Sequence, residues 1–227
     1  MSVVEDPAPK RWQVTVSKAL LRVWLLTVRQ DSVVTPSGKE LTRIAVTHPG
    51  AVVILALDDS ERVLMIKQYR HPAGRELWEV PAGLRDVAQE SLLAAAEREL
   101  REETFYQARR WDTLVDYYTS PGFSDERIRI FLARDLVRPS AGELARQEAE
   151  RAEKLKNAED DEETYIVTAW VPLPEAVELA LAGRLRNGPA VTAVLAGSAA
   201  LSRGFAGLRP ADAPEDDVPE DEERLRK

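Results

Sequence analysis

Hydrophobic and polar positions in the middle of the chain predict a series of β-strands. Residues 51–57 form an uninterrupted apolar run, AVVILAL, which is typical of a buried strand. Residues 62–70 predict a second strand, which is expected to pair with the first as a hairpin because only a short polar turn separates the two runs. Further strands are expected at residues 111–118, 127–133 and 164–171.

The N-terminal part of the chain also has the pattern of strands. Residues 12–16 alternate between apolar and polar positions, residues 20–28 are rich in Leu, Val and Trp, and residues 40–47 follow a turn that contains Pro and Gly. A unit of this size is too small to be expected to fold alone. Residues 1–10 carry two prolines without periodicity and are expected to be loose.

Three segments have the composition and periodicity of helices. Residues 91–104 are rich in Ala, Leu, Glu and Arg, which are strong helix formers. The apolar stripe of this helix would consist of Leu93, Ala96 and Leu100. Two further helices are expected at residues 173–181 and 187–201, with breaks at the glycines nearby.

Two polar segments are expected to have little or no core. Residues 140–163 consist mainly of charged helix formers followed by EDDEE, which predicts an exposed helix and a mobile acidic loop. From Arg209 onward the chain is composed mainly of Pro, Asp, Glu and Ala, which predicts a disordered tail.

Composition narrows the classes of protein and partner. The chain has 227 residues, 44% of them hydrophobic, but no apolar run of membrane length and no N-terminal pattern of a secretory signal, so no membrane association is expected. It has no cysteine, which excludes disulfides and thiolate sites and is compatible with a cytoplasmic location. Its net charge of −8 gives no general attraction for nucleic acid.

The helix at residues 91–104 places three carboxylates close together. Glu99, Glu102 and Glu103 fall within an arc of about 100° beside the apolar stripe, where they repel one another. Arg98 and Arg101 offset part of this repulsion, and Arg98 can reach Glu102 one turn later. A divalent cation would offset the rest, since hard ions such as Mg2+ take carboxylate oxygens.

Runs of Arg and Glu on a helix usually form a solvated charged face. The spacing of the surrounding residues favours a functional role for this helix instead. The segment has the form G-x6-E-x7-R-E-L-x-E-E, which resembles the Nudix box. The residues that match the box are Gly83, Glu90, Arg98, Glu99, Leu100, Glu102, Glu103 and Tyr106. There are two departures: one extra residue lies between Gly83 and Glu90, and Phe105 stands where the family has glycine.

The resemblance implies an α/β fold, a Nudix-type α/β/α sandwich around a mixed sheet, with a small N-terminal β-rich unit. It implies a hydrolase of nucleoside diphosphates linked to another group. The chain is then divided into a flexible N-terminus (1–10), an N-terminal β-rich dimerisation unit (11–47), a Nudix hydrolase domain (48–208) and a disordered acidic tail (209–227).

Three further segments are similar to the ADP-ribose pyrophosphatase branch of this family. They are KQYR at residues 67–70, LWEVPAG at residues 77–83, and TSPGFSDE at residues 119–126, where Pro121 follows the box at the distance typical of that branch. By composition alone the last segment is only a turn. In that branch the N-terminal β-rich unit exchanges contacts between two subunits, so the resemblance, which covers roughly residues 40–200, implies a homodimer that converts ADP-ribose to AMP and ribose 5-phosphate.

The resemblance also implies how the metal is held. Mg2+, with Mn2+ as the alternative, would bind across the pyrophosphate of the substrate and activate water. The expected metal ligands are Glu99 and Glu103, helped by Glu102 and the carbonyl of Ala82. Arg98 would orient these glutamates, and Glu79 would supply a further carboxylate near the metals.

Other residues are expected to bind the substrate or act as a base. Arg70, at a strand end just before the box, is the best candidate for the pyrophosphate because a guanidinium offers bidentate hydrogen bonds, and Arg43 is a weaker one. A loop glutamate would be the general base, and the acidic run leaves Glu162 and Glu163 as alternatives. His48 and His71 are expected to be structural or surface residues.

Two alternative functions stay open from the sequence. The substrate could be another nucleoside diphosphate sugar or a dinucleotide, or the protein could be a nucleotide-sensing module that binds without hydrolysis. Phe105 favours the sensing module, and the complete set from Arg98 to Glu103 opposes it. We expect the box helix to end at or just after Thr104, with Phe105 buried at a negative φ.

Overall fold

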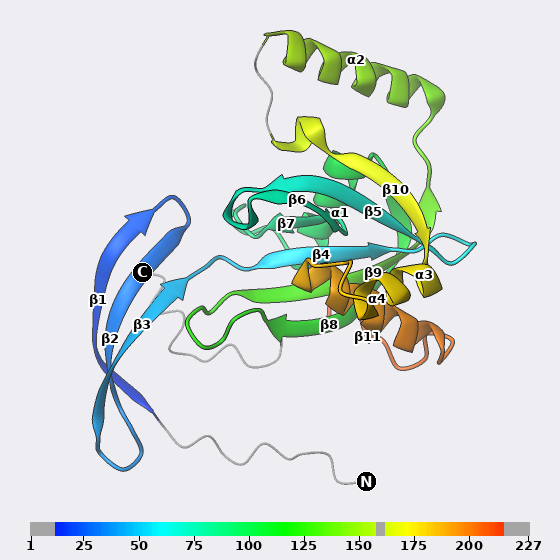
Figure 1. Ribbon diagram of the computed structural model, residues 1–227. Helices are drawn as coiled ribbons and strands as arrows, with labels where there is room; N and C mark the ends of the chain where they lie inside the picture. The colour runs from blue at the N-terminus through cyan, green and yellow to red at the C-terminus, as the bar shows by residue number, and fades with distance from the viewer. Residues whose placement is uncertain (1–11, 158–161, 216–227) are drawn as a thin grey trace. The chain divides into compact units, whose positions relative to one another are not determined.

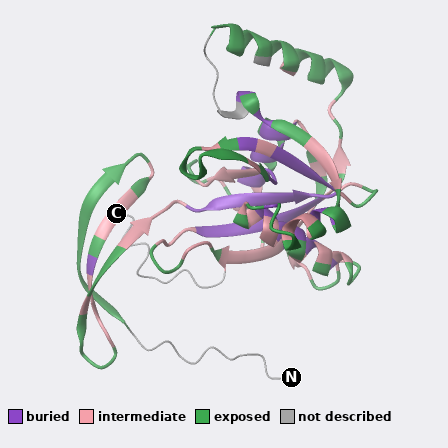
Figure 2. Ribbon diagram, viewed as in Figure 1, coloured by how far each residue is buried: buried purple, intermediate pink, exposed green. Residues whose placement is uncertain are grey.

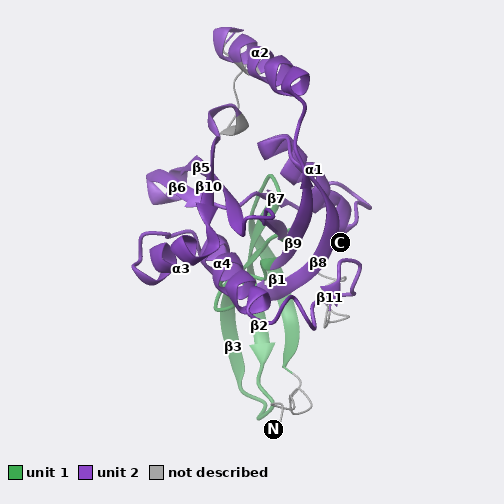
Figure 3. Cartoon of the chain, turned by 90° about the vertical axis from the view of Figure 1, so that its right-hand side faces the viewer, with its two compact units in different colours: residues 1–50, 118–127 green, residues 51–117, 128–227 purple. Residues whose placement is uncertain are grey.

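The computed structural model describes residues 12–157 and 162–215 (Figure 1). The chain forms two compact units, coloured separately in Figure 3. Unit 1 comprises residues 1–50 and 118–127, and unit 2 comprises residues 51–117 and 128–227. The boundary predicted at residue 47 stays a prediction, and the sequence did not indicate that residues 118–127 group with the first segment.

Unit 1 is built on an antiparallel sheet in the order β1-β2-β3. Its strands are β1 (Gln13–Val23), β2 (Leu26–Val34) and β3 (Glu40–Thr47). The prediction of one strand over residues 20–28 is wrong, because the chain reverses after Val23 and Trp24 adopts a φ of 48°. A two-residue turn made without Gly, Asn or Asp has no signature in the sequence.

The loop at residues 119–126 packs on β3. Val46 donates its N–H to the Phe123 carbonyl at 2.7 Å, and the Asp125 N–H donates to the Val46 carbonyl at 3.2 Å. The Asp125 carboxylate accepts from the His48 N–H at 2.8 Å and pairs with Arg29 at 3.3 Å. These contacts explain why the loop joins unit 1.

Unit 2 contains a mixed five-stranded sheet and a second sheet of three strands. The larger sheet has the order β11-β8-β9-β4-β7, with β4 parallel to β9 and antiparallel to β7. Its strands are β4 (Ala51–Ala56), β7 (Ala82–Leu84), β8 (Gln107–Tyr118), β9 (Arg127–Val137) and β11 (Arg209–Pro210). The smaller sheet has the order β10-β5-β6, with strands β5 (Arg62–Arg70), β6 (Arg75–Glu79) and β10 (Val167–Pro172).

The predicted hairpin between residues 51–57 and 62–70 is wrong. β4 and β5 belong to different sheets, and the turn between them carries an isolated bridge between Leu57 and Val63 and a hydrogen bond from the Asp58 N–H to the Arg62 carbonyl at 3.0 Å. Both edges of β4 are already paired, one with β9 and the other with β7. These long-range pairings satisfy the backbone of β4, so β5 pairs elsewhere.

Helices form and end largely where the sequence predicts them. The box helix is α1 (Leu92–Thr104), and Ser91 caps it by accepting a hydrogen bond from the Ala94 N–H at 3.1 Å. The C-terminal helices are α3 (Leu173–Leu181) and α4 (Gly188–Leu201), and Asn187 caps α4 through the Ala190 N–H at 2.9 Å. The exposed helix predicted within residues 140–163 is α2 (Ala141–Asn157).

The buried strand β4 separates two helical layers. Val52 and Ile54 belong to the core cluster that contains Ala96 and Leu100 of α1. Side chains of opposite orientation, such as Val53 and Leu55, belong to the cluster formed with α3 and α4. Figure 2 shows β4 fully buried between these layers, as expected for a strand covered on both faces. The predicted α/β/α sandwich around a mixed sheet is confirmed.

The prediction of a disordered tail from Arg209 is wrong for residues 209–215. β11 pairs with β8, and the Thr113 hydroxyl donates to the Pro210 carbonyl at 2.9 Å. Residues 1–11, 158–161 and 216–227 lie outside the described part of the chain, and with them most of the acidic loop and of the acidic tail that the sequence predicts. No helix within the described ranges is long and apolar enough to span a membrane.

Candidate active site

β7 brings the backbone of Gly83 against the side chain of Glu99. A Cβ atom at Gly83 would lie 1.9 Å from the Cδ of Glu99, so glycine is the only residue that leaves this carboxylate in place. Glu99 is one of the few charged residues that are buried, with 8% of its surface exposed. The first position of the motif therefore requires glycine, because any side chain there would occupy the space of the Glu99 carboxylate.

Glu103 lies one turn further along α1 and contacts the same strand. Its Oε2 accepts a hydrogen bond from the Ala82 N–H at 3.0 Å, and the residue is also only 8% exposed. Residues four apart lie on one face of a helix, so Glu99 and Glu103 both face β7. Two buried carboxylates on one helical face form the centre of the candidate site.

Arg98 holds three carboxylates at once. Its Nε and one terminal nitrogen donate to the two oxygens of Glu90, each at 3.1 Å. Its other terminal nitrogen donates to Glu99 at 2.6 Å and to Glu102 at 3.0 Å, so the predicted contact with Glu102 is present. The hydrogen bonds that Arg98 donates to Glu90 raise the pKa of Arg98 most, burial lowers it, and Glu99 and Glu102 raise it further, which keeps the guanidinium charged. Sequence reasoning placed Glu90 in the motif but did not predict its role as the bidentate partner of Arg98.

The donor set fits a hydrated divalent cation. Within residues 12–157 and 162–215, no three Asp, Glu, His or Cys side chains converge as a complete metal cage. Mg2+ does not require one, because it keeps several waters and binds through one or two carboxylates together with substrate phosphates. Glu99 and Glu103 supply two such carboxylates, whereas Glu102 is more exposed and is engaged by Arg98.

Arg70 and Glu79 bind each other. Two nitrogens of Arg70 donate to the two oxygens of Glu79 at 2.9 and 2.6 Å. Glu79 is only 2% exposed, whereas the Arg70 side chain is 38% exposed. The buried carboxylate thus fixes the orientation of an accessible guanidinium, and the role predicted for Arg70 toward the pyrophosphate stays a prediction.

The remaining predicted residues lie either in unit 1 or at positions whose side chains the structure does not describe. Arg43 lies exposed on β3 and donates to the Thr42 carbonyl at 2.9 Å, and Pro121 lies exposed in the loop that packs on β3. Both belong to unit 1. Glu162 and Glu163 begin the short 3-10 helix Glu162–Tyr165 before β10, and their side chains lie outside the described part of the structure.

Comparison with known proteins identifies this arrangement. The family model of the NUDIX domain matches residues 46–193, which include every residue of the candidate site in unit 2. The chain belongs to the Nudix family.

Individual Nudix relatives are similar over much of the chain. An ADP-ribose pyrophosphatase of Mycobacterium tuberculosis (strain ATCC 25618 / H37Rv) is 44% identical over 188 residues, which cover 83% of each chain. An ADP-ribose pyrophosphatase of Bacillus subtilis (strain 168) is 43% identical over 106 residues, which cover 47% of this chain and 57% of that protein. A solved structure of an ADP compounds hydrolase matches with a TM-score of 0.68 at 20% identity, covering 88% of this chain and all of the other, and supports the fold.

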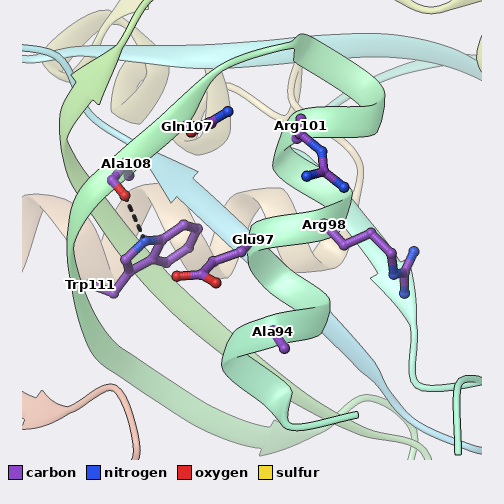
Figure 4. Close-up of a pocket in the computed structure, with 7 residues that line it drawn as sticks. All are labelled: Ala94, Glu97, Arg98, Arg101, Gln107, Ala108 and Trp111. Atoms are coloured by element: carbon purple, nitrogen blue, oxygen red, sulfur yellow. Dashed lines mark hydrogen bonds between the residues drawn. The ribbon is translucent and has the colours of Figure 1, made fainter.

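A pocket of about 310 Å³ lies on a different side of the Nudix helix (Figure 4). It is lined by Ala94, Glu97, Arg98 and Arg101 of α1 and by Gln107, Ala108 and Trp111 of β8. Figure 4 shows Glu97 extending toward Trp111, whose indole N–H donates to the Ala108 carbonyl at 3.2 Å. Glu99 and Glu103 do not line this pocket, so it is not the place where they would hold a metal.

The prediction for Phe105 is correct for the helix end and wrong for its conformation. α1 ends at Thr104, but Phe105 has a φ of 65° and is only half-buried. Its N–H donates to the Arg101 carbonyl at 2.8 Å, as in the left-handed cap that usually carries glycine. The geometry of the helix end therefore overrides the preference of phenylalanine for negative φ.

Phe105→Gly is expected to raise the free energy of unfolding by about 1 kcal/mol, because glycine removes the crowding of Cβ in the left-handed conformation. Chemical denaturation of the two proteins measures this change. The rate of hydrolysis is expected to stay within about tenfold of the wild type, since the helix already ends in the geometry of the family. Destabilisation by the substitution would show that packing of the Phe105 ring outweighs the backbone strain.

Proposed function

We propose that this Nudix protein hydrolyses the pyrophosphate of ADP-ribose to AMP and ribose 5-phosphate, with Mg2+ as the cofactor and Mn2+ as the alternative. The observation that carries the proposal is the pair of buried carboxylates, Glu99 and Glu103, held beside β7 by the Arg98 network and the space at Gly83. The choice of substrate is supported by the relative from Mycobacterium tuberculosis, which is named an ADP-ribose pyrophosphatase and covers most of the chain.

Each residue of the network has a defined task in this reaction. A bound divalent metal supplies Lewis-acid stabilisation of the phosphate oxygens and lowers the pKa of water. Glu99 and Glu103 would hold that metal, and Ala82 orients Glu103 through its N–H. Arg98 restrains Glu99 by a direct hydrogen bond. Arg70, oriented by Glu79, would bind an oxygen of the pyrophosphate.

The chemical step is the addition of water to one phosphorus and the loss of the bridging P–O bond. The base that accepts the proton of the water is Glu162 or Glu163, the two alternatives left by the sequence. Glu99 and Glu103 would be engaged with the metal, so the proton acceptor is expected from outside α1.

Turnover of ADP-ribose with and without Mg2+ tests the proposal. We expect AMP and ribose 5-phosphate as products, in equal amounts, and loss of turnover when EDTA removes the metal. A panel of other nucleoside diphosphate sugars and dinucleotides, assayed in parallel, measures the preference through kcat/KM. Faster turnover of a different compound would replace the substrate in the proposal, and binding without hydrolysis of any of them would favour the sensing module.

Substitution of the two acidic candidates separates the base from a bystander. Either Glu162→Gln or Glu163→Gln is expected to lower kcat by about 100-fold or more, with much less change in KM, because proton transfer in the transition state contributes on this scale. The other substitution serves as the matched control in the same short helix. If both variants keep wild-type turnover, the base lies elsewhere in the chain.

We further propose that the protein is a homodimer that uses unit 1. The sheet of unit 1 exposes many large apolar side chains in a single chain: Trp12, Val14, Val16, Leu20, Leu21, Val23, Trp24 and Ile44. Many exposed large apolar side chains on one small sheet are consistent with an interaction site. Light scattering at micromolar concentration is expected to give twice the chain mass, and a fully active monomer would rule the dimer out.

The cytoplasmic location expected from the sequence stays a prediction.

A further inference from the structure

The segment at residues 209–215 is tied to the strands of unit 2 by a buried arginine. Arg129 of β9 is 2% exposed and binds both oxygens of Asp116 on β8 at 2.8 Å. Its terminal nitrogens also donate to the carbonyls of Ala213 at 2.6 Å and Pro214 at 3.2 Å. A buried guanidinium requires such acceptors, because an unsatisfied buried charge is strongly destabilising.

A second ion pair strengthens the same attachment. Arg209 donates to the Asp116 carboxylate at 2.8 Å, so Asp116 joins the beginning of the segment to Arg129. Burial raises the pKa of Asp116, but the hydrogen bonds and charges of Arg129 and Arg209 outweigh it and hold the pKa below its ordinary value. Asp116 is therefore ionised at neutral pH, and the segment is held in place by charge-assisted bonds at both of its ends.

The segment then reaches the loop that opens the Nudix box. Arg85 donates to the Glu215 carboxylate at 3.0 Å, and the two side chains are only 24% and 16% exposed. Arg85 follows Gly83 by two residues, and Gly83 is the residue whose backbone lies against the Glu99 carboxylate. Glu215 thus acts on the strand end that contacts the candidate metal ligands.

The loop between Arg85 and Glu90 is one residue longer than in the family pattern, so side-chain contacts at its ends are expected to matter more for its conformation. It contains the extra residue relative to the family pattern, residues 86–89 are exposed, and Gln89 has a φ of 65°. At its far end Glu90 is held by the bidentate contact with Arg98. At its near end the side-chain anchor is the ion pair of Arg85 with Glu215.

We propose that Glu215 is a positioning residue of the active site: by binding Arg85, it holds β7 and the box loop so that Ala82 and Gly83 meet Glu103 and Glu99. Partners of this kind, which orient the groups that bind a metal, commonly contribute 10- to 100-fold to metal affinity or activity. The kinetic part of this inference rests on the proposed function, and the conformational part does not.

Glu215→Gln, which removes the charge with little change of shape, tests the proposal in the full-length protein. We expect kcat for ADP-ribose to fall about tenfold, the concentration of Mg2+ for half-maximal rate to rise several-fold, and KM for ADP-ribose to change less than about twofold. Asp212→Asn is the matched control, because Asp212 is an exposed carboxylate of the same segment and forms no ion pair within the described residues. The control is expected to behave as the wild type.

Hydrogen–deuterium exchange of the peptide covering residues 84–90 gives a readout that does not depend on catalysis. Exchange is expected to accelerate in Glu215→Gln and not in Asp212→Asn. The charge exchange of Arg85→Glu with Glu215→Arg is expected to restore both slow exchange and turnover relative to either single variant. Rescue by the double variant would show that the two side chains act through their ion pair, and the melting temperatures of the single variants separate this effect from a loss of global stability.

Three results would overturn the proposal. They are unchanged exchange and kcat in Glu215→Gln, a lower melting temperature with kcat and Mg2+ dependence unchanged, and failure of the charge exchange to recover either property. If the wild-type protein does not hydrolyse ADP-ribose, the proposed function fails instead. In that case exchange of residues 84–90 and titration of Mn2+ by electron paramagnetic resonance still decide whether Glu215 positions the loop.

Discussion

Glu103→Gln is expected to lower kcat for ADP-ribose by at least about 100-fold, the scale on which loss of one key electrostatic group affects catalysis. The substitution keeps the size of the side chain and its ability to accept from the Ala82 N–H, but it removes the negative charge. Glu103 is buried beside β7, so no exposed carboxylate can readily take its place. Steady-state kinetics over a range of Mg2+ concentrations measures the change and separates weaker metal binding from a slower step.

Glu97→Gln is the matched control for this experiment. Glu97 is exposed on α1 and lines the pocket near Trp111, not the face that carries Glu99 and Glu103. Its substitution changes the net charge by the same amount in the same helix, and turnover is expected to stay at the wild-type level. Unchanged turnover in Glu103→Gln itself would remove the metal assignment.

Gly83→Ala is expected to abolish most activity while leaving the fold nearly as stable as in the wild type. The new Cβ would lie 1.9 Å from the Cδ of Glu99, so that side chain must rotate away or β7 must shift relative to β4. The obstructing group is the end of a flexible side chain, so the cost to stability is small. Its displacement moves a predicted metal ligand, and a shift of about 1 Å can cost about 100-fold in rate.

Gly142→Ala controls for the loss of a glycine, since Gly142 lies in the exposed helix α2 and a Cβ there would meet nothing within 4 Å. Parallel measurements of the melting temperature and kcat distinguish the two effects. A fully active Gly83→Ala protein would show that Glu99 does not need its observed position. Equal loss of stability and activity would show that the space at Gly83 serves the fold alone.

Features set by neighbouring residues could be predicted from the sequence. Ser91 and Asn187 cap α1 and α4 because their short polar side chains satisfy the first backbone N–H groups of a helix. The alternation of α1 between apolar and acidic positions indicated which residues enter the core and which form the candidate site. The fixed spacing of the box also linked Gly83 of β7 to the glutamates of α1, which the pattern of the helix alone does not indicate.

Features set by distant partners could not be predicted in this way. The separation of β4 from β5 depends on β9 and β7, which occupy both edges of β4. The order of residues 209–215 depends on Arg129, 80 or more positions earlier in the chain, whose burial demands carbonyl acceptors. The conformation of Phe105 depends on the hydrogen bond to Arg101 that ends the helix.

The sharing of Arg98 among Glu90, Glu99 and Glu102 has a consequence for how the site tolerates change. When one carboxylate is removed, the guanidinium can shift toward the other two. Part of the lost interaction energy is then recovered, and the positions of the remaining carboxylates change. Energies of residues within one such network do not add. The effect of a second substitution among these glutamates therefore depends on which one was changed first. The free-energy effects of substitutions among the four side chains are coupled.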